Sequence, residues 1–186
     1  MKRKRAEEEA QTRARIAQAA VDLHGSIGPA RTTISAVAER AGVRRATVYR
    51  HFPDEVALFS ACSSRWLAQN PLPDVSQLSA LEDESRRLEA ALTAVYGYYR
   101  PNVRMLSNVI RDAETSPALR ETLAGFQAWL ADLHAALAPA PGPPLRGAAL
   151  AHALSFPAWH ALAIGQGLSD AEARVLMCAM VAAVPG

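Results

Sequence analysis

Apolar side chains recur at intervals of three and four residues through most of this 186-residue chain. The clearest run is Leu119, Leu123, Phe126, Leu130, Leu133 and Leu137. This spacing puts them along one side of an α-helix, whereas no segment alternates as a half-buried strand does. We therefore predict an all-α protein with nine helices, over residues 6–24, 34–41, 44–51, 53–70, 81–100, 102–114, 117–138, 145–166 and 170–184.

The composition is that of a globular protein, with half of the residues apolar and a fifth charged. The most apolar stretch, 147–165, is interrupted by polar side chains and by Pro157, which argues against a membrane span. Residues 1–5 are basic, but three glutamates follow at 7–9, so no targeting segment is recognised. We expect a cytoplasmic protein.

Side chains that could act in catalysis or bind a metal are scattered along the sequence. Cys62 and Cys178 are far apart, which favours two small apolar residues in a reducing compartment over a redox switch. The sequence has no nucleophile elbow, no phosphate-binding glycine loop and no metal-spaced histidine pair. We predict no catalytic residue, no metal and no cofactor, and therefore a protein that is not an enzyme.

The charge is distributed unevenly. Residues 1–70 hold 12 basic and 7 acidic side chains, whereas residues 71–186 hold 8 basic and 11 acidic ones. A basic N-terminal part and an acidic C-terminal part favour an anionic partner for the N-terminal part alone.

The segment 32–52 carries the most specific pattern. Two short amphipathic stretches meet at Gly42, where a tight turn favours a residue that tolerates positive φ. The small Ala38 permits close approach of two helices. A short second helix that presents Arg, Thr, Tyr and His suits insertion into the major groove of DNA. The alternative is an αα-corner with no DNA contact, which does not require three arginines around its second helix.

The candidate DNA-binding residues are Thr33, Arg44, Arg45, Thr47, Tyr49, Arg50 and His51. Arginine can bridge two acceptors of guanine, and hydroxyl groups can bind phosphates.

Residues 33–59 read TISAVAERAGVRRATVYRHFPDEVALF, which strongly resembles the signature of the TetR family of transcriptional regulators. The resemblance implies Ω-shaped homodimers that pair through their last two helices. It implies a recognition helix at about 44–50, with phosphate contacts from Tyr49 and from residues near Thr33 and Thr47. It also implies a small-molecule ligand that releases DNA.

Two positions depart from the family pattern. Arg44 stands where the family more often has a serine that caps the recognition helix. Pro53-Asp54 stands where Ser-Lys often begins the fourth helix, so a lysine contact to phosphate is missing. The basic residues 2–5 either compensate by reaching the DNA backbone or minor groove, or form a solvated, disordered terminus.

The part of the chain after residue 70 is predicted to bind an apolar or amphipathic ligand. The candidate ligand-binding residues are Trp66, Tyr96, Tyr99, Met105, Phe126, Trp129 and Trp159, with Phe156 as a further aromatic. The polar candidates are Asn108, Arg111, Gln127, His134, His152 and His160. For each of these large side chains, packing in the core is the alternative.

We thus predict a helix-turn-helix domain over 1–52, a connecting helix over 53–70 and a ligand-binding and dimerisation domain over 71–186. The predicted function is a repressor that binds operator DNA as a homodimer and is released by a small-molecule inducer. The alternative is a helical adaptor or regulator that acts through protein partners with little ligand sensing.

Overall fold

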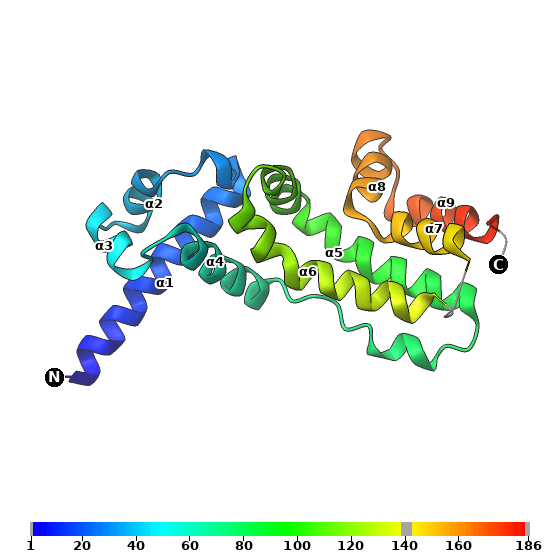
Figure 1. Ribbon diagram of the computed structural model, residues 1–186, viewed down its shortest axis with the longest axis horizontal. Coiled ribbons are helices and arrows are strands. Elements are labelled where there is room, and N and C mark those ends of the chain that lie inside the picture. The colour runs from blue at the N-terminus through cyan, green and yellow to red at the C-terminus, as the bar shows by residue number, and fades with distance from the viewer. Residues whose placement is uncertain (1, 139–142, 185–186) are drawn as a thin grey trace. The chain divides into compact units, whose positions relative to one another are not determined.

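The computed structural model describes residues 2–138 and 143–184, and within these ranges it is all-α (Figure 1). The nine α-helices are α1 (Lys2–Ile27), α2 (Ile34–Ala41), α3 (Arg45–His51), α4 (Glu55–Gln69), α5 (Glu84–Ala113), α6 (Pro117–Leu137), α7 (Pro144–Leu154), α8 (Phe156–His160) and α9 (Asp170–Ala182). Three short helical turns join them: η1 (Pro29–Arg31), η2 (Ser76–Ala80) and the π-turn η3 (Ala161–Gly165). The predicted fold class is confirmed.

The chain divides into two compact units. The first comprises Met1–Pro71 with Arg104–Ala124, and the second comprises Leu72–Val103 with Gly125–Gly186. Both α5 and α6 therefore contribute residues to each unit. The functional domain boundaries after residues 52 and 70 stay a prediction.

The core of the first unit holds the helix-turn-helix. Residues of α1 to α4 and of α5 share one apolar cluster, whose largest members are Ile16, Val37, Val48, Phe52, Leu58 and Met105. Ile16, Val37 and Val48 are fully buried. Burial of these side chains stabilises the short helices α2 and α3, which are too short to be stable alone.

Helix α1 begins at Lys2, earlier than the predicted start at residue 6. Arg3 and Glu7 are one turn apart and form an ion pair of 3.3 Å. Such (i, i+4) pairs favour a helix modestly. The basic residues 3–5 are thus helical and exposed.

The prediction that a helix ends at Pro101 is wrong, because α5 continues through this residue to Ala113. Pro101 removes the N–H that would bond to the carbonyl of Gly97, and Gly97 is exposed. At the next residue, the Asn102 side-chain amide donates to the carbonyl of Tyr98 at 2.8 Å. Buried residues on both sides, among them Tyr99 and Leu106, stabilise the helix by packing.

The prediction of one helix over 145–166 is also wrong. The helix breaks at Ser155, whose φ and ψ are −74° and 140°, and whose hydroxyl accepts from the N–H of Ala158 at 3.3 Å. Ser155 is the N-cap of α8, and Pro157 lies in the first turn of that helix. A capping serine and a first-turn proline together start a new helix.

The core of the second unit is aromatic. Tyr96 and Tyr99 donate hydrogen bonds to the carbonyls of Ala153 and Leu154, at 2.8 and 2.7 Å. Trp159 is fully buried and its indole N–H donates to Asp170 at 2.9 Å. These bonds satisfy the polar atoms that the rings take into the core.

Candidate nucleic-acid interface

Helices α2 and α3 form a helix-turn-helix through a left-handed turn. Thr33 caps α2, because its hydroxyl accepts from the N–H of Ala36 at 3.1 Å. Gly42 ends α2 with φ 64° and ψ 40°, a conformation that favours glycine. The N–H of Val43 then bonds to the carbonyl of Ala38 at 2.9 Å. This turn directs α3 away from α2 and leaves one face of α3 open.

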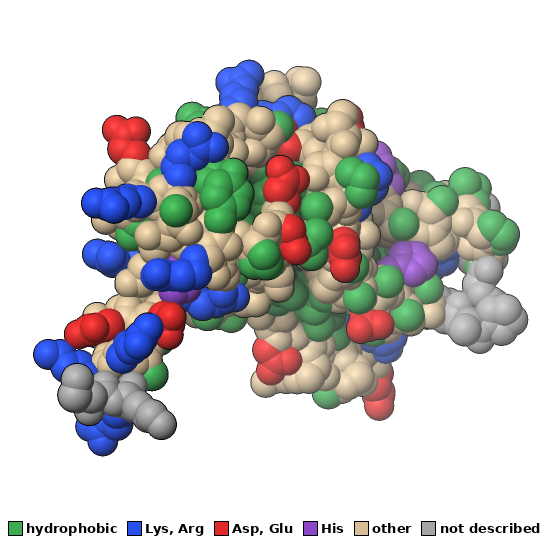
Figure 2. Space-filling view, turned by 60° about the vertical axis from the view of Figure 1, so that its left-hand side comes forward, with side chains coloured by type: hydrophobic (Ala, Val, Ile, Leu, Met, Phe, Trp, Pro, Cys, Tyr) green, Lys and Arg blue, Asp and Glu red, His purple; other side chains and the backbone are tan. Residues whose placement is uncertain are grey.

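The open face of α3 is basic. Arg44, Arg45 and Arg50 are exposed, and none has a hydrogen bond or ion pair to another side chain of the described ranges. Tyr49 is 48% exposed, which is unusual for a large aromatic side chain on a packed helix. Lys and Arg side chains gather on this side of the first unit (Figure 2). The guanidinium groups are therefore free to contact phosphates or base edges.

The remaining predicted DNA-binding residues are less open. Thr33 is exposed and Thr47 is half-buried. His51 is half-buried, and its Nε2 is buried without a hydrogen-bond partner among the described residues. All seven residues lie on α3 or at the N-caps of α2 and α3, and their contact with DNA stays a prediction.

The two departures from the family pattern have local consequences. Arg44 occupies the N-cap of α3 and makes no side-chain capping bond. Asp54 caps α4 instead of contacting phosphate, because its carboxylate accepts from the N–H of Ala57 at 2.7 Å.

Arg13 of α1 fixes the end of α3. Its guanidinium donates to the carbonyl of His51 at 2.6 Å and lies 4.3 Å from the centre of the Phe52 ring. A cation at a helix C-terminus is favourable, and so is its position over an aromatic face. Arg13 and His51 are 38 residues apart, so local sequence signals do not indicate this contact.

The connection before α2 is held by the last turns of α5. Asp112 is buried and accepts from the N–H of Ala30 at 2.9 Å and from the Arg111 side chain at 2.8 Å. Asn108 donates to the carbonyl of His24 at 2.9 Å. Burial alone would raise the pKa of Asp112. The hydrogen bonds that it accepts from Arg111 and Ala30, together with the charges of Arg111 and Arg31, lower this pKa instead.

Gly28 makes this approach possible. Its φ is 92°, and a Cβ built on it would lie 2.5 Å from the Arg111 guanidinium and 2.8 Å from the Asp112 carboxylate. A turn at Gly28-Pro29 can be read from the sequence, but its partner 84 residues later cannot. Asn108 and Arg111, predicted as polar ligand candidates, lie in this connection within the first unit.

Residues 16–62 match the profile of bacterial regulatory proteins of the tetR family. This range contains α2, α3 and most of the core residues that pack against them. This segment of the chain, which carries the helix-turn-helix, is thereby assigned to the tetR family. No curated protein sequence matches the chain.

Solved structures resemble the chain over nearly its whole length. NalD, the secondary repressor of the MexAB-OprM multidrug efflux pump in Pseudomonas aeruginosa, is 26% identical with a TM-score of 0.64, covering 94% of this chain and 95% of NalD. The multidrug binding protein EbrR, solved with imidazole, is 24% identical with a TM-score of 0.63. The alignment covers 94% of this chain and 96% of EbrR. A transcriptional regulator from Saccharomonospora viridis, in complex with choline, is 17% identical with a TM-score of 0.66. The alignment covers 94% of this chain and 97% of that regulator.

The matched segment and the shared fold identify a DNA-binding transcriptional regulator, and TetR-family regulators are transcription factors rather than enzymes. No helix of the described residues is long and apolar enough to cross a membrane. The described residues also contain no cluster of acidic, His or Cys side chains suited to a metal ion.

The predicted ligand-binding residues fall into two groups. Trp66 and Met105 pack in the core of the first unit. The second unit brings together Tyr96, Tyr99, Phe126, Trp129, Phe156 and Trp159, whose ring centres lie 5.3 to 6.5 Å apart along the chain of contacts. Tyr96, Tyr99 and Trp159 are fully buried in this group, whereas Phe126 and Trp129 are half-buried. Their role toward a ligand stays a prediction.

Two of the polar candidates also have partners. A ring nitrogen of His134 lies 2.9 Å from the carbonyl oxygen of Gly147, and the His160 ring lies against Phe156 at 5.5 Å. His152 and Gln127 are exposed.

Proposed function

We propose that this protein is a repressor that binds operator DNA as a homodimer, with α3 of each subunit in the major groove. The observation that carries the proposal is the exposed side of α3 and its N-cap, which presents three unpaired arginines together with Tyr49. None of these guanidinium groups has a hydrogen bond or ion pair to another side chain of the described residues. Stability of the fold therefore does not explain why three arginines lie on this face. Arg44, Arg45 and Arg50 supply phosphate and base contacts, and Tyr49 contacts the backbone.

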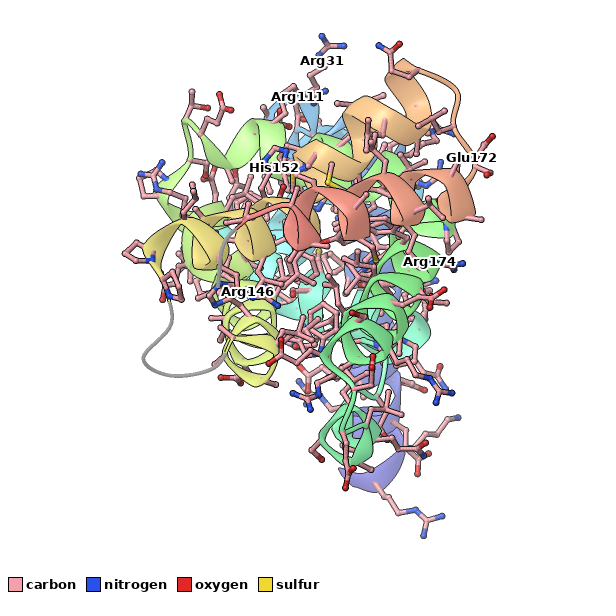
Figure 3. All side chains as sticks on the ribbon, turned by 90° about the vertical axis from the view of Figure 1, so that its right-hand side faces the viewer. Arg31, Arg111, Arg146, His152, Glu172 and Arg174 are labelled. Atoms are coloured by element: carbon pink, nitrogen blue, oxygen red, sulfur yellow. The ribbon has the colours of Figure 1, made fainter. Side chains whose placement is uncertain are left out.

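The proposed dimer forms through α7 and α9. Figure 3 looks onto these two helices of the second unit. Their outward side chains are mainly apolar: Leu145 is 63% exposed, Val175 64% and Leu176 48%, with Ala148 and Ala151 exposed beside them. A monomer rarely leaves a large apolar patch in water, so these exposed apolar side chains favour a face that is covered in the assembled protein. Burial against a second copy removes it and sets the spacing between the two recognition helices.

We propose further that a small molecule binds the second unit and releases DNA. The name of NalD describes a repressor, and that of EbrR describes a protein that binds several drugs. The aromatic group around Phe126 and Trp129 offers apolar and aromatic surface of the kind that binds such ligands. Action on DNA in the bacterial cytoplasm is part of the same proposal. An adaptor that acts through proteins alone does not account for the unpaired arginines of α3.

The DNA-binding proposal is tested with three variants in a gel shift on the upstream region of the gene. Tyr49→Ala and Arg50→Ala are expected to abolish retention of the DNA while the helical circular dichroism spectrum stays unchanged. Arg86→Ala removes an equal charge from an exposed site on α5, where the side chain has no partner among the described residues, and should bind as wild type. Retention by the two α3 variants would contradict the assignment.

The dimer is tested by sedimentation. Val175→Asp and Leu176→Asp place charges on the apolar face of α9 and should yield folded monomers with weak operator binding. A dimer that persists in both variants would place the interface elsewhere.

A further inference from the structure

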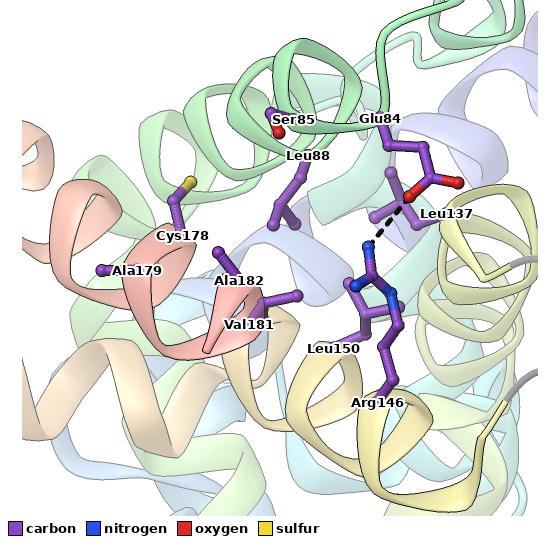
Figure 4. Close-up of a pocket in the computed structure, with 10 residues that line it drawn as sticks. All are labelled: Glu84, Ser85, Leu88, Leu137, Arg146, Leu150, Cys178, Ala179, Val181 and Ala182. Carbon is purple, nitrogen blue, oxygen red and sulfur yellow. Dashed lines mark hydrogen bonds and ion pairs between the residues drawn. The ribbon is translucent and has the colours of Figure 1, made fainter. Parts of the chain in front are cut away.

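The second unit contains a cavity apart from the aromatic group. Its volume is about 300 Å³, and it lies between the start of α5, the end of α6, α7 and α9 (Figure 4). Its apolar lining includes Leu88, Leu137, Leu150 and Val181, each of which is at least nine-tenths buried. None of the predicted ligand-binding residues lines it. The volume is at the lower end of that of small-molecule sites.

One edge of the cavity is charged. Arg146 extends from α7 toward Glu84 in the first turn of α5, and their side chains form an ion pair of 2.9 Å (Figure 4). The two partners differ in burial, because the Arg146 side chain is 22% exposed and that of Glu84 is 55% exposed. The cavity thus presents apolar walls together with one largely buried cation, whose carboxylate partner is open to water.

The difference in burial decides which charge a ligand uses. Glu84 retains much of its hydration and lies at the start of α5, where a negative charge is favourable without Arg146. Arg146 has lost most of its contact with water, so an acceptor is required at its guanidinium. A ligand carboxylate can replace that of Glu84 there, and a guanidinium binds carboxylates through two parallel bonds.

We propose that this cavity binds a small amphipathic carboxylate, with the carboxylate on Arg146 and an apolar chain against the leucines and Val181. The binding proposal is independent of the proposed repressor function. Only an effect of the same ligand on operator release rests on that function.

The cavity contains its own reporter. Cys178 of α9 lines it and is half-buried, whereas Cys62 is 5% exposed in the core of the first unit. Burial raises the pKa of both thiols, and it raises that of Cys62 to about 12, so that least of the reactive thiolate forms at the more deeply buried Cys62. An aromatic disulfide reagent should therefore modify Cys178 first, and a ligand in the cavity should slow this reaction.

The experiment measures the rate of Cys178 modification in the full chain against the concentration of octanoate, with octanol and octylamine as head-group controls. Mass spectrometry of the labelled peptides separates Cys178 from Cys62. We expect octanoate to protect Cys178 at least tenfold more effectively than either control. Equal protection by octanol would overturn the proposal, since the carboxylate would then contribute nothing.

Two charge variants give opposite expectations. Arg146→Gln should weaken octanoate protection by about tenfold to a hundredfold, the range for a charge-assisted hydrogen bond. Glu84→Gln should strengthen it, because the competing carboxylate is gone. Arg146→Lys keeps the charge and should keep partial protection, which separates loss of binding from loss of folding. If octylamine protected Cys178 better than octanoate, and Glu84→Gln abolished that protection, the cavity would bind cations. This result would overturn the proposal.

The operator complex is measured separately. Protection of Cys178 without release of DNA leaves the carboxylate site intact and counts against its role in regulation. Release of DNA by octanoate without protection of Cys178 overturns this site and leaves the repressor function standing.

Discussion

The carboxylate of Asp112 accepts a hydrogen bond from the N–H of Ala30, 82 residues earlier in the chain. Ala30 lies in η1, three residues before the N-cap of α2. The end of α5 thereby holds the segment that leads into the helix-turn-helix. The position of α2 and α3 depends on a side chain outside the DNA-binding segment itself.

Replacement of Asp112 should affect stability and DNA binding together. Asp112→Ala leaves the N–H of Ala30 and the Nε–H of Arg111 without their acceptor, and we expect unfolding to become easier by about 2 kcal/mol. Asp112→Asn keeps one acceptor oxygen and should lose about half of that. Urea unfolding measures both, with Asp132→Ala, an exposed site on α6, as the control that stays within about 0.5 kcal/mol of wild type. Equal stability of Asp112→Ala and wild type would refute the role of this bond.

Gly28 and Gly125 should respond oppositely to the same substitution. Gly28→Ala places a Cβ against Arg111 and Asp112 at positive φ, so we expect a loss of about 1–3 kcal/mol. Gly125 lies within α6 and nothing is within 4 Å of its added Cβ. Gly125→Ala should therefore gain about 0.5–1 kcal/mol. Thermal unfolding of the two variants would contradict the account if both lost stability equally.

Stability should fall in mildly acidic solution because of His24. Burial lowers the pKa of His24 to about 4, and the nearby Asp112 acts in the opposite direction. The unfolded chain takes up this proton near pH 6.5, so the free energy of unfolding should decrease as the pH falls from about 6.5 to 4. At pH 5 the loss relative to pH 7.5 should be about 2 kcal/mol.

The variant His24→Gln has no group that titrates at this position and should lose most of that pH dependence in urea unfolding. His152→Gln, at an exposed site on α7, should keep it. An unchanged pH profile in His24→Gln would assign the effect to other groups.

Arg13 should matter for DNA binding although it lies on α1. Arg13→Ala removes the bond to the His51 carbonyl and the contact with Phe52. We expect a stability loss of about 1 kcal/mol or less, because the site is exposed, and weaker operator binding because the end of α3 is less well held. Arg13→Lys should recover part of the affinity by retaining the charge. Identical operator titrations for wild type and Arg13→Ala would disprove this positioning role.

The sequence contained enough to predict the helix-turn-helix almost to the residue. Gly42 identifies the turn, and the apolar spacing of Val37, Ala38 and Val48 identifies the buried faces. These signals are local, because a left-handed turn and a capping threonine depend on neighbouring residues. The break at Ser155 in the helix predicted over 145–166 also has a local signal. A serine two residues before Pro157 indicates the start of a new helix.

Features that depend on distant residues could not be predicted in this way. Pro101 normally ends a helix, but packing on both sides of it outweighs the lost hydrogen bond. The contacts of Asp112 with Ala30 and of Arg13 with His51 join residues far apart in the sequence. The split of the large apolar residues between two units, with Trp66 and Met105 in one and Trp159 in the other, likewise depends on tertiary packing.

The central claim is most directly tested by titrating the purified protein into a fluorescent duplex of its own upstream region at several salt concentrations. The account predicts tight, sequence-selective binding of two subunits per site, with an affinity that falls steeply as salt rises because phosphate contacts release counterions. Arg50→Ala should reduce both the affinity and the salt slope. Weak binding that is equal on scrambled DNA, and unchanged by Arg50→Ala, would contradict the proposal that α3 reads an operator.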